Sequence, residues 1–110
     1  MYNWATNDVL TATKLNPAIV SKAAGDSPYT PSLNDDIILC NCTAGAITIN
    51  LPTAVGNTKI FNIKKTDSST NAVTVDGNGT QTIDGDLTLI IFGEGDSYTL
   101  ISDGANWKVI

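Results

Sequence analysis

The chain has 110 residues, of which 42% are hydrophobic and 15% are charged, and its formal net charge is −5. This length suits one small domain, and the composition excludes a disordered tail and a coiled coil rich in Glu and Lys. Because the chain has neither Arg nor His, and no apolar run near the roughly 20 residues of a membrane span, we expect no nucleic-acid binding, no membrane insertion, no common zinc site and no His-based catalysis.

Residues 1–30 are expected to form an N-terminal leader, for attachment and oligomerisation, followed by a Pro-rich linker. The leader lacks strict alternation of apolar and polar residues. Asn7-Asp8 or Thr11 can cap a short helix that ends at Lys14 or Leu15, and residues 18–24 can form a second helical turn. The two prolines within residues 25–34 favour an extended path into the rest of the chain.

Five apolar side chains of the leader are too few to build a core within one chain. A helix this short is marginal by itself, so it needs either the remaining domain or further copies of the chain to pack on. We expect three copies to bury these side chains against each other in a parallel homotrimer. The five are Val9, Leu10, Leu15, Ile19 and Val20.

Residues 31–110 are expected to form an all-β domain, a small antiparallel β-sandwich or a barrel-like domain. Short segments of alternating or apolar residues recur about every ten residues, and turns rich in Gly, Asp and Asn separate them. Thr occupies many of the alternate positions, which suits the solvent side of strands. The expected strands are residues 36–42, 46–51, 59–65, 72–76, 81–84, 87–92, 96–102 and 107–110.

Two of these strands are apolar on both faces, at residues 37–40 and 87–92. A small sandwich buries only one face of each strand, so such a strand is either central and covered or part of a subunit interface. Both interpretations stay open here. The second makes Ile90 and Phe92 candidate oligomerisation residues.

Cys40 and Cys42 are the only cysteines, and on a strand they point to the same face. Their Cα atoms would then lie roughly 6.6 Å apart with parallel Cβ directions, at the limit of disulfide geometry. We expect no disulfide and interpret them as two small buried hydrophobic residues. A soft-metal site or a redox pair is the alternative.

The turn that begins at Asp76-Gly-Asn78 resembles the start of a calcium loop, but position twelve is Leu87 instead of Glu. Asp84 and Asp86 can add oxygens from a neighbouring turn. The simpler interpretation is a hairpin whose glycines permit positive φ. We expect no bound metal and no cofactor.

The same carboxylates are poor candidates for glycosidase chemistry, because aspartates two apart across a glycine are common in turns. Trp107 follows a turn at Asp103-Gly104. It can be a platform for sugar stacking, but we expect it to close the end of the core. No catalytic residues are predicted, and we expect that the protein is not an enzyme.

Residues 45–85, followed by residues 97–110, strongly resemble a small β module of tailed-bacteriophage fibre and appendage proteins. The leader, WATNDVLTATKLN, is similar to the N-terminal segment found near the start of many phage fibre proteins. The chain differs from the family at Cys40 and Cys42, where aliphatic or polar residues are usual. The most specific matches are residues 51–52, 64–65, 67–69, 82–85, 102–104 and Trp107.

The resemblance implies a virion structural protein, either a head or tail fibre or a decoration protein, that is trimeric and has no enzymatic activity. Such a protein is assembled in the host cytoplasm and attaches through its leader to capsid, portal or tail proteins, while the β domain projects. The alternative is a carbohydrate-binding adhesin tip whose loops hold host surface glycans. An exposed cluster of Trp or Tyr with Asp or Asn would favour that alternative.

Overall fold

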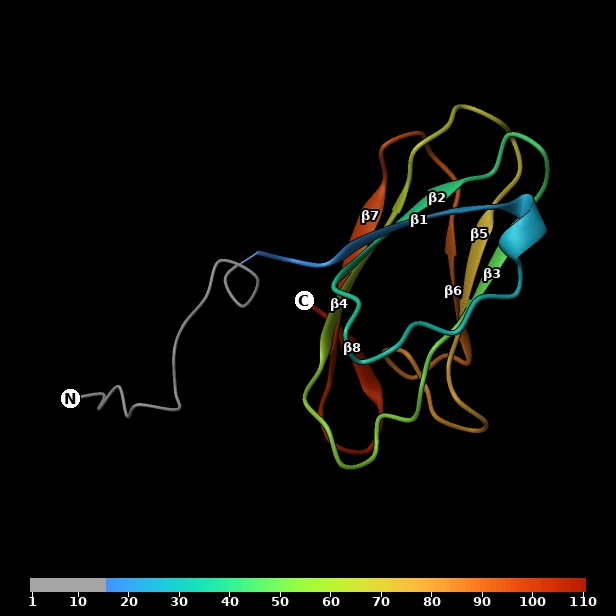
Figure 1. Ribbon diagram of the computed structural model, residues 1–110. Coiled ribbons are helices and arrows are strands. Elements are labelled where there is room, and N and C mark those ends of the chain that lie inside the picture. The colour runs from blue at the N-terminus through green and yellow to red at the C-terminus, as the bar shows by residue number, and fades with distance from the viewer. Residues whose placement is uncertain (1–15) are drawn as a thin grey trace, which may run out of the picture.

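The computed structural model describes residues 16–110 and places them in two β-sheets (Figure 1). A five-stranded sheet has the order β1-β2-β4-β7-β8, and a three-stranded sheet has the order β3-β5-β6. The expected all-β class is therefore confirmed. The elements are β1 (Ile19–Ala23), the 3₁₀ helix η1 (Ala24–Asp26), β2 (Ile37–Asn41), β3 (Ile47–Asn50), β4 (Ile60–Lys65), β5 (Val73–Asp76), β6 (Thr88–Ile91), β7 (Ser97–Ser102) and β8 (Trp107–Val109).

The strand pairing is mixed, so the expectation of an antiparallel domain is wrong. The β1–β2, β2–β4 and β3–β5 pairs are parallel, whereas β4–β7, β5–β6 and β7–β8 are antiparallel. The reason is that the chain changes sheet after β2, after β3 and after β4. β4 returns to the five-stranded sheet after the single strand β3, and β5 returns to the three-stranded sheet after the single strand β4, so β2–β4 and β3–β5 run parallel. β7 returns only after the β5–β6 hairpin and runs antiparallel to β4.

The expected helical turn at residues 18–24 is also wrong, because most of this segment is strand β1. Ile19 and Val20 pair in parallel register with Ile37 and Ile38. The backbone carbonyl of Ala18 accepts hydrogen bonds from two amides at the start of β2, at 2.9 and 3.0 Å. The pairing partner in β2, which lies far along the chain, determines the strand conformation here. The five-stranded sheet therefore begins before residue 31, within the segment assigned to the leader.

Each of β2 to β8 lies inside one expected strand segment. The remaining expected segment, residues 81–84, is not a strand; Ile83 makes only isolated bridges, to Asp86 and Trp107. Asp84 and Gly85 have φ values of 49° and 92°. Such left-handed backbone belongs to a tight turn and interrupts a ladder.

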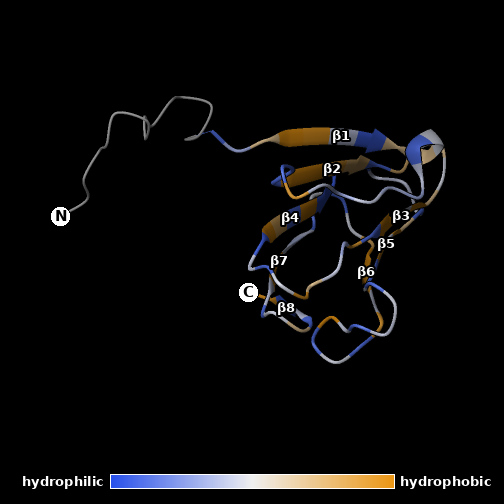
Figure 2. Ribbon diagram, turned by 60° about the horizontal axis from the view of Figure 1, so that its bottom comes forward, coloured by the Kyte–Doolittle hydropathy of each residue, from blue (hydrophilic) through white to orange (hydrophobic). Residues whose placement is uncertain are grey.

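The core lies between the two sheets, which form separate layers in Figure 2. Inward residues alternate with outward ones along each strand, as a half-buried sheet requires. Cys40 and Cys42 are free, fully buried members of this core, which confirms their interpretation as buried hydrophobic residues. The buried hydrophobic residues are Ile38, Cys40, Cys42, Ile47, Ile49, Leu51, Ala54, Phe61, Ile63, Val73, Val75, Ile83, Ile91, Leu100 and Trp107.

Trp107 closes one end of this core, as expected from its position after a turn. Its indole is fully buried and lies 5.6 Å from the ring of Phe61, centroid to centroid. The indole N–H donates a hydrogen bond to the carbonyl of Pro52 at 3.2 Å, which anchors the loop between β3 and β4. Because a buried ring has no free face, Trp107 is not available for stacking on a sugar.

We predict that Trp107→Ala lowers the free energy of unfolding by about 3–5 kcal/mol, since it removes the largest buried side chain and leaves a cavity. Urea denaturation of both proteins gives the difference. Lys108→Ala is the control, because Lys108 is the exposed neighbour on β8 and its loss should change stability by about 0.5 kcal/mol or less. A Trp107→Ala protein within about 1 kcal/mol of wild type would contradict the packing described here.

Candidate functional site

The predicted oligomerisation residues fall into three groups. Val9, Leu10 and Leu15 lie outside the described residues. Val20 is partly buried against the core of its own chain, whereas the sequence analysis expected that only other copies could bury it. Ile19, Ile90 and Phe92 are exposed, with 57%, 36% and 67% of their surface accessible.

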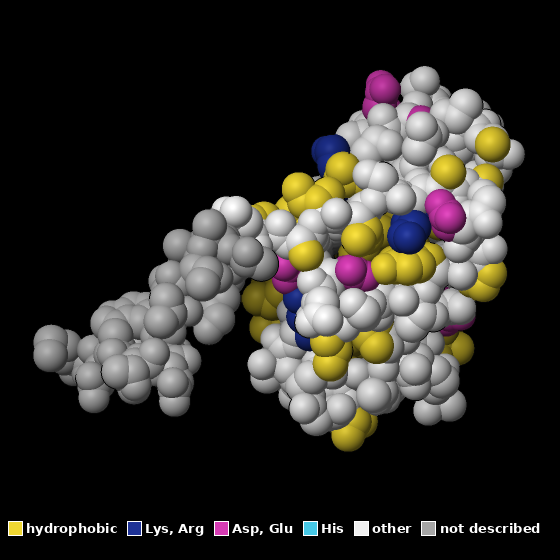
Figure 3. All heavy atoms as spheres, viewed as in Figure 1, with side chains coloured by type: hydrophobic (Ala, Val, Ile, Leu, Met, Phe, Trp, Pro, Cys, Tyr) yellow, Lys and Arg dark blue, Asp and Glu magenta, His cyan; other side chains and the backbone are white. Residues whose placement is uncertain are grey.

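Ile19 belongs to a larger apolar surface on the outside of the five-stranded sheet, which we name the outer apolar face. The register places Ile19 beside Ile37 in one row and Ile60 beside Ile101 in another. Ile60 and Ile110 are 46% and 68% exposed. Figure 3 shows hydrophobic side chains along the flank of the folded part on which the C-terminal end lies in Figure 1. The outer apolar face comprises Ile19, Ile37, Leu39, Ile60, Ile101 and Ile110.

The charge on this surface has a single sign. The other outward residues of the five strands are small or neutral, apart from Lys64 and Lys108, and no carboxylate is among them. The Lys64 ammonium donates to the carbonyl of Gly95 at 2.7 Å, so it is held at one end of the sheet. The outward strand positions of this sheet therefore carry positive charge in a chain whose net charge is −5, although Asp96 and Asp103 lie exposed just beyond the ends of β7.

The opposite surface, on the three-stranded sheet, is different. Its outward residues on β3 and β5 are polar, and Asp76 is the one charged side chain among them. The edge strand β6 pairs only with β5 and adds exposed apolar side chains. We name Leu87, Ile90 and Phe92 the β6 patch; they are 57%, 36% and 67% exposed.

A buried ion pair between Lys65 and Asp67 holds the β4–β5 connection against the core. The Lys65 side chain is fully buried; its ammonium lies 3.2 Å from the Asp67 carboxylate and donates to the carbonyls of Asp67 and Ser69 at 2.8 and 2.9 Å. Asp67 in turn accepts backbone N–H bonds from Cys42 and Ser69 at 2.7 and 3.0 Å. The sequence analysis assigned no role to this cluster. The one available signal was that Lys65 lies on the same side of its strand as Phe61 and Ile63.

Burial of Asp67 acts to raise its pKa, but hydrogen bonds from Ser69, Cys42 and Lys65 outweigh that effect and hold the pKa of Asp67 well below its usual range.

Burial raises the pKa of the Cys40 thiol to about 12, and it also raises the pKa of Cys42. Both thiols are therefore protonated at neutral pH, whereas metal binding and thiol exchange need the thiolate. This argues against the soft-metal or redox interpretation.

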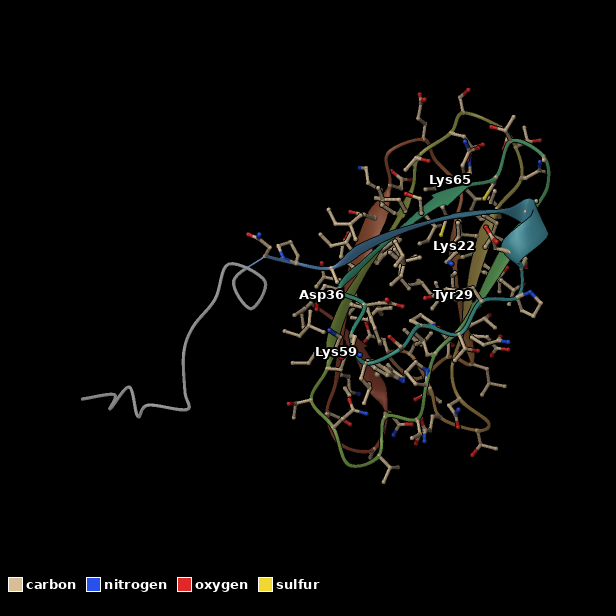
Figure 4. The ribbon with its side chains drawn as sticks, in the orientation of Figure 1. Lys22, Tyr29, Asp36, Lys59 and Lys65 are labelled. Carbon is tan, nitrogen blue, oxygen red and sulfur yellow. The ribbon has the colours of Figure 1, made fainter. Side chains whose placement is uncertain are left out.

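A second polar cluster, partly visible in Figure 4, holds the linker before β2 against the sheets. The Tyr29 hydroxyl donates to the buried carboxylate of Asp35, and the Lys22 ammonium lies 4.2 Å from the centre of the Tyr29 ring. The hydrogen bond to Asp35, with burial, raises the pKa of Tyr29 to about 12. Lys59 pairs with Asp36 and so joins the starts of β2 and β4. These contacts hold the linker and the two strands together, and among residues 16–110 no buried side-chain polar atom is left without a partner.

The acidic turns do not form a metal site in residues 16–110. Across this range, no three His, Cys, Asp or Glu side chains gather closely enough to hold an ion, so Asp84 and Asp86 do not join Asp76 in a calcium site. The positive φ values of Gly79 and Gly85, 57° and 92°, agree with the simpler interpretation of these segments as turns. Within the same range, no helix is long and apolar enough to cross a membrane.

No protein-family model matches the chain, and no curated protein matches it. The similarity to phage fibre modules therefore stays a prediction from the residues. The candidate functional surfaces that the structure adds are the outer apolar face and the β6 patch.

We predict that the stabilising effect of the Asp67 carboxylate depends on pH. A carboxylate whose pKa is lowered in the folded state contributes stability above its unfolded pKa, near 3.9, and loses that contribution as the pH falls toward the folded value. Asp67→Asn should therefore be less stable than wild type at pH 7, and the difference should shrink below about pH 4. Urea denaturation at pH 7, 4 and 2.5 measures it.

Asp86→Asn is the control for this prediction, since Asp86 lies exposed in a turn and should change stability little at any pH. A difference between wild type and Asp67→Asn that is the same at pH 7 and pH 2.5 would contradict the ionised state assigned to Asp67.

Proposed function

We propose that the chain is a bacteriophage virion structural protein, a head or tail fibre or a decoration protein. It forms a homotrimer, attaches to capsid, portal or tail proteins through its N-terminal residues, and projects the two-sheet domain. It acts by assembly and not by catalysis. The single observation that best supports this proposal is the outer apolar face, which the described residues 16–110 leave open to solvent.

The physical argument starts from the three exposed isoleucines of that face, Ile19, Ile60 and Ile110. Soluble monomers rarely keep a contiguous apolar surface exposed, and larger ones mark sites of association. Burial contributes about 25 cal/mol per Å² of apolar area, so several isoleucines from each copy supply a useful association energy. The lack of carboxylates on the face also removes much of the repulsion that copies with a net charge of −5 experience elsewhere.

The position of β1 suits attachment through the N-terminal residues. β1 is an edge strand, and residues 16–18, which precede it, are exposed at the side of the domain (Figure 1). Residues 16–18 therefore enter the domain at a sheet edge. Three domains can therefore present their N-terminal segments together to one socket on the particle.

The adhesin alternative is less favoured, because Trp107, its main candidate for stacking on a sugar, is buried. The aromatic rings exposed most in the described part of the chain are Phe92 and, to a lesser degree, Tyr98. They lie on different sheets, and Phe92 has no polar tip for a sugar hydroxyl. We therefore favour the assembly function.

We predict that multi-angle light scattering of the intact protein gives three times the chain mass of 11.5 kDa. Leu15→Asp should weaken the trimer or its attachment to the particle, because it places a charge among the apolar leader residues, while circular dichroism shows the β domain still folded. Thr13→Asp is the matched control, since it adds the same charge at a polar position nearby. A folded monomer at micromolar concentration would refute the proposed trimer.

A further inference from the structure

We propose that the copies meet through two different surfaces, with the β6 patch of one copy packed on the outer apolar face of the next. This inference rests on the proposed function, because it specifies how a homotrimer would be joined. The partner is a second copy of this chain. Two observations support it: the difference in charge between the two outward sheet surfaces, and the different shapes of their apolar side chains.

The charges of the two surfaces are complementary. Lys64 and Lys108 are the charged residues among the outward positions of the five-stranded sheet. Asp76 is the charged residue at the outward positions of the three-stranded sheet. Beyond the strand ends both sheets carry exposed carboxylates, Asp86 and Glu94 near β6 and Asp96 and Asp103 near β7, so the difference in charge lies at the outward strand positions. Joining unlike surfaces brings lysines toward carboxylates. Joining like surfaces would bring lysines toward lysines or carboxylates toward carboxylates, which is unfavourable.

The apolar side chains also differ in a complementary way. Phe92 is 67% exposed, just after the last residue of edge strand β6. On the outer apolar face, half-buried Ile37 and Leu39 of β2 lie beside Asn62 and Lys64 of β4, whereas half-buried Ile101 of β7 lies beside Ile60. The rim is formed by exposed Ile19, Ile60 and Ile110, as described above. Protruding aromatic rings that pack on apolar surfaces are the usual energetic centres of interfaces.

A contact between two unlike surfaces is heterologous. Each copy then uses one surface toward one neighbour and the other surface toward the next, and three copies close as a ring when each contact rotates the next copy by a third of a full turn. In the proposed trimer every copy therefore contributes both surfaces. An isologous contact would use one surface twice and stop at a dimer.

The test uses two variants that each disable one surface. Ile60→Asp places a charge in the outer apolar face, and Phe92→Asp places one in the β6 patch. Both residues are exposed, so both variants should fold, which circular dichroism checks. Each variant alone should be a monomer, with self-association weakened about 30-fold or more. Val55→Asp, at a 61% exposed site in the loop between β3 and β4, is the control and should remain trimeric.

Mixing the two variants is the decisive step. Ile60→Asp keeps its β6 patch and Phe92→Asp keeps its outer apolar face, so one intact contact remains. An equimolar mixture should therefore give a heterodimer, twice the chain mass of 11.5 kDa, that cannot grow further. A mixture that stays monomeric, or a Phe92→Asp protein that still self-associates like wild type, overturns the inference while leaving the proposed trimer intact. A wild-type monomer overturns both.

Discussion

The structure depends on one constraint, which is that every strand of both sheets must bury one side in a single shared layer. The buried residues of β2, β4, β7 and β8 face those of β3, β5 and β6 across this layer. The chain crosses from one sheet to the other after each of β2, β3 and β4. As a result, β4 lies next to β2 in one sheet, and β5 lies next to β3 in the other. This path makes β2–β4 and β3–β5 parallel, although the connections between neighbouring segments are short.

Polar groups stabilise the crossings between the sheets. Between β4 and β5, the Lys65–Asp67 pair satisfies its own charges and ties the connection to Cys42, just after the neighbouring strand β2. Between β3 and β4, the fully buried hydroxyl of Ser102 donates to the carbonyls of Ala54 and Asn57 at 2.6 and 3.0 Å. Such buried polar groups are tolerated because each has a partner, and within residues 16–110 no buried side-chain polar atom lacks one.

The same constraint explains why the outward surfaces are the candidate functional sites. Once the core and the crossings have used the inward residues, the apolar side chains left on the outside have no partner within residues 16–110. They are concentrated on the outward side of the five-stranded sheet and along β6, with lysines beside the first group and carboxylates beside the second. A head or tail fibre or decoration protein would use such surfaces for assembly, where stability comes from repeated copies as well as from the small core of one chain.

The sequence by itself determined the all-β class and the positions of β2 to β8, because alternation and turn chemistry are local properties of the chain. It also determined the burial of Trp107 and of the two cysteines. Only the tertiary structure decided which strands are neighbours, since strand hydrogen bonds join residues far apart in sequence. For that reason the sequence analysis predicted a helical turn where β1 lies, and it did not assign the consecutive strands β3 and β4 to different sheets. For the same reason, sequence positions alone did not show that Ile37, Ile60 and Ile101 lie on one surface.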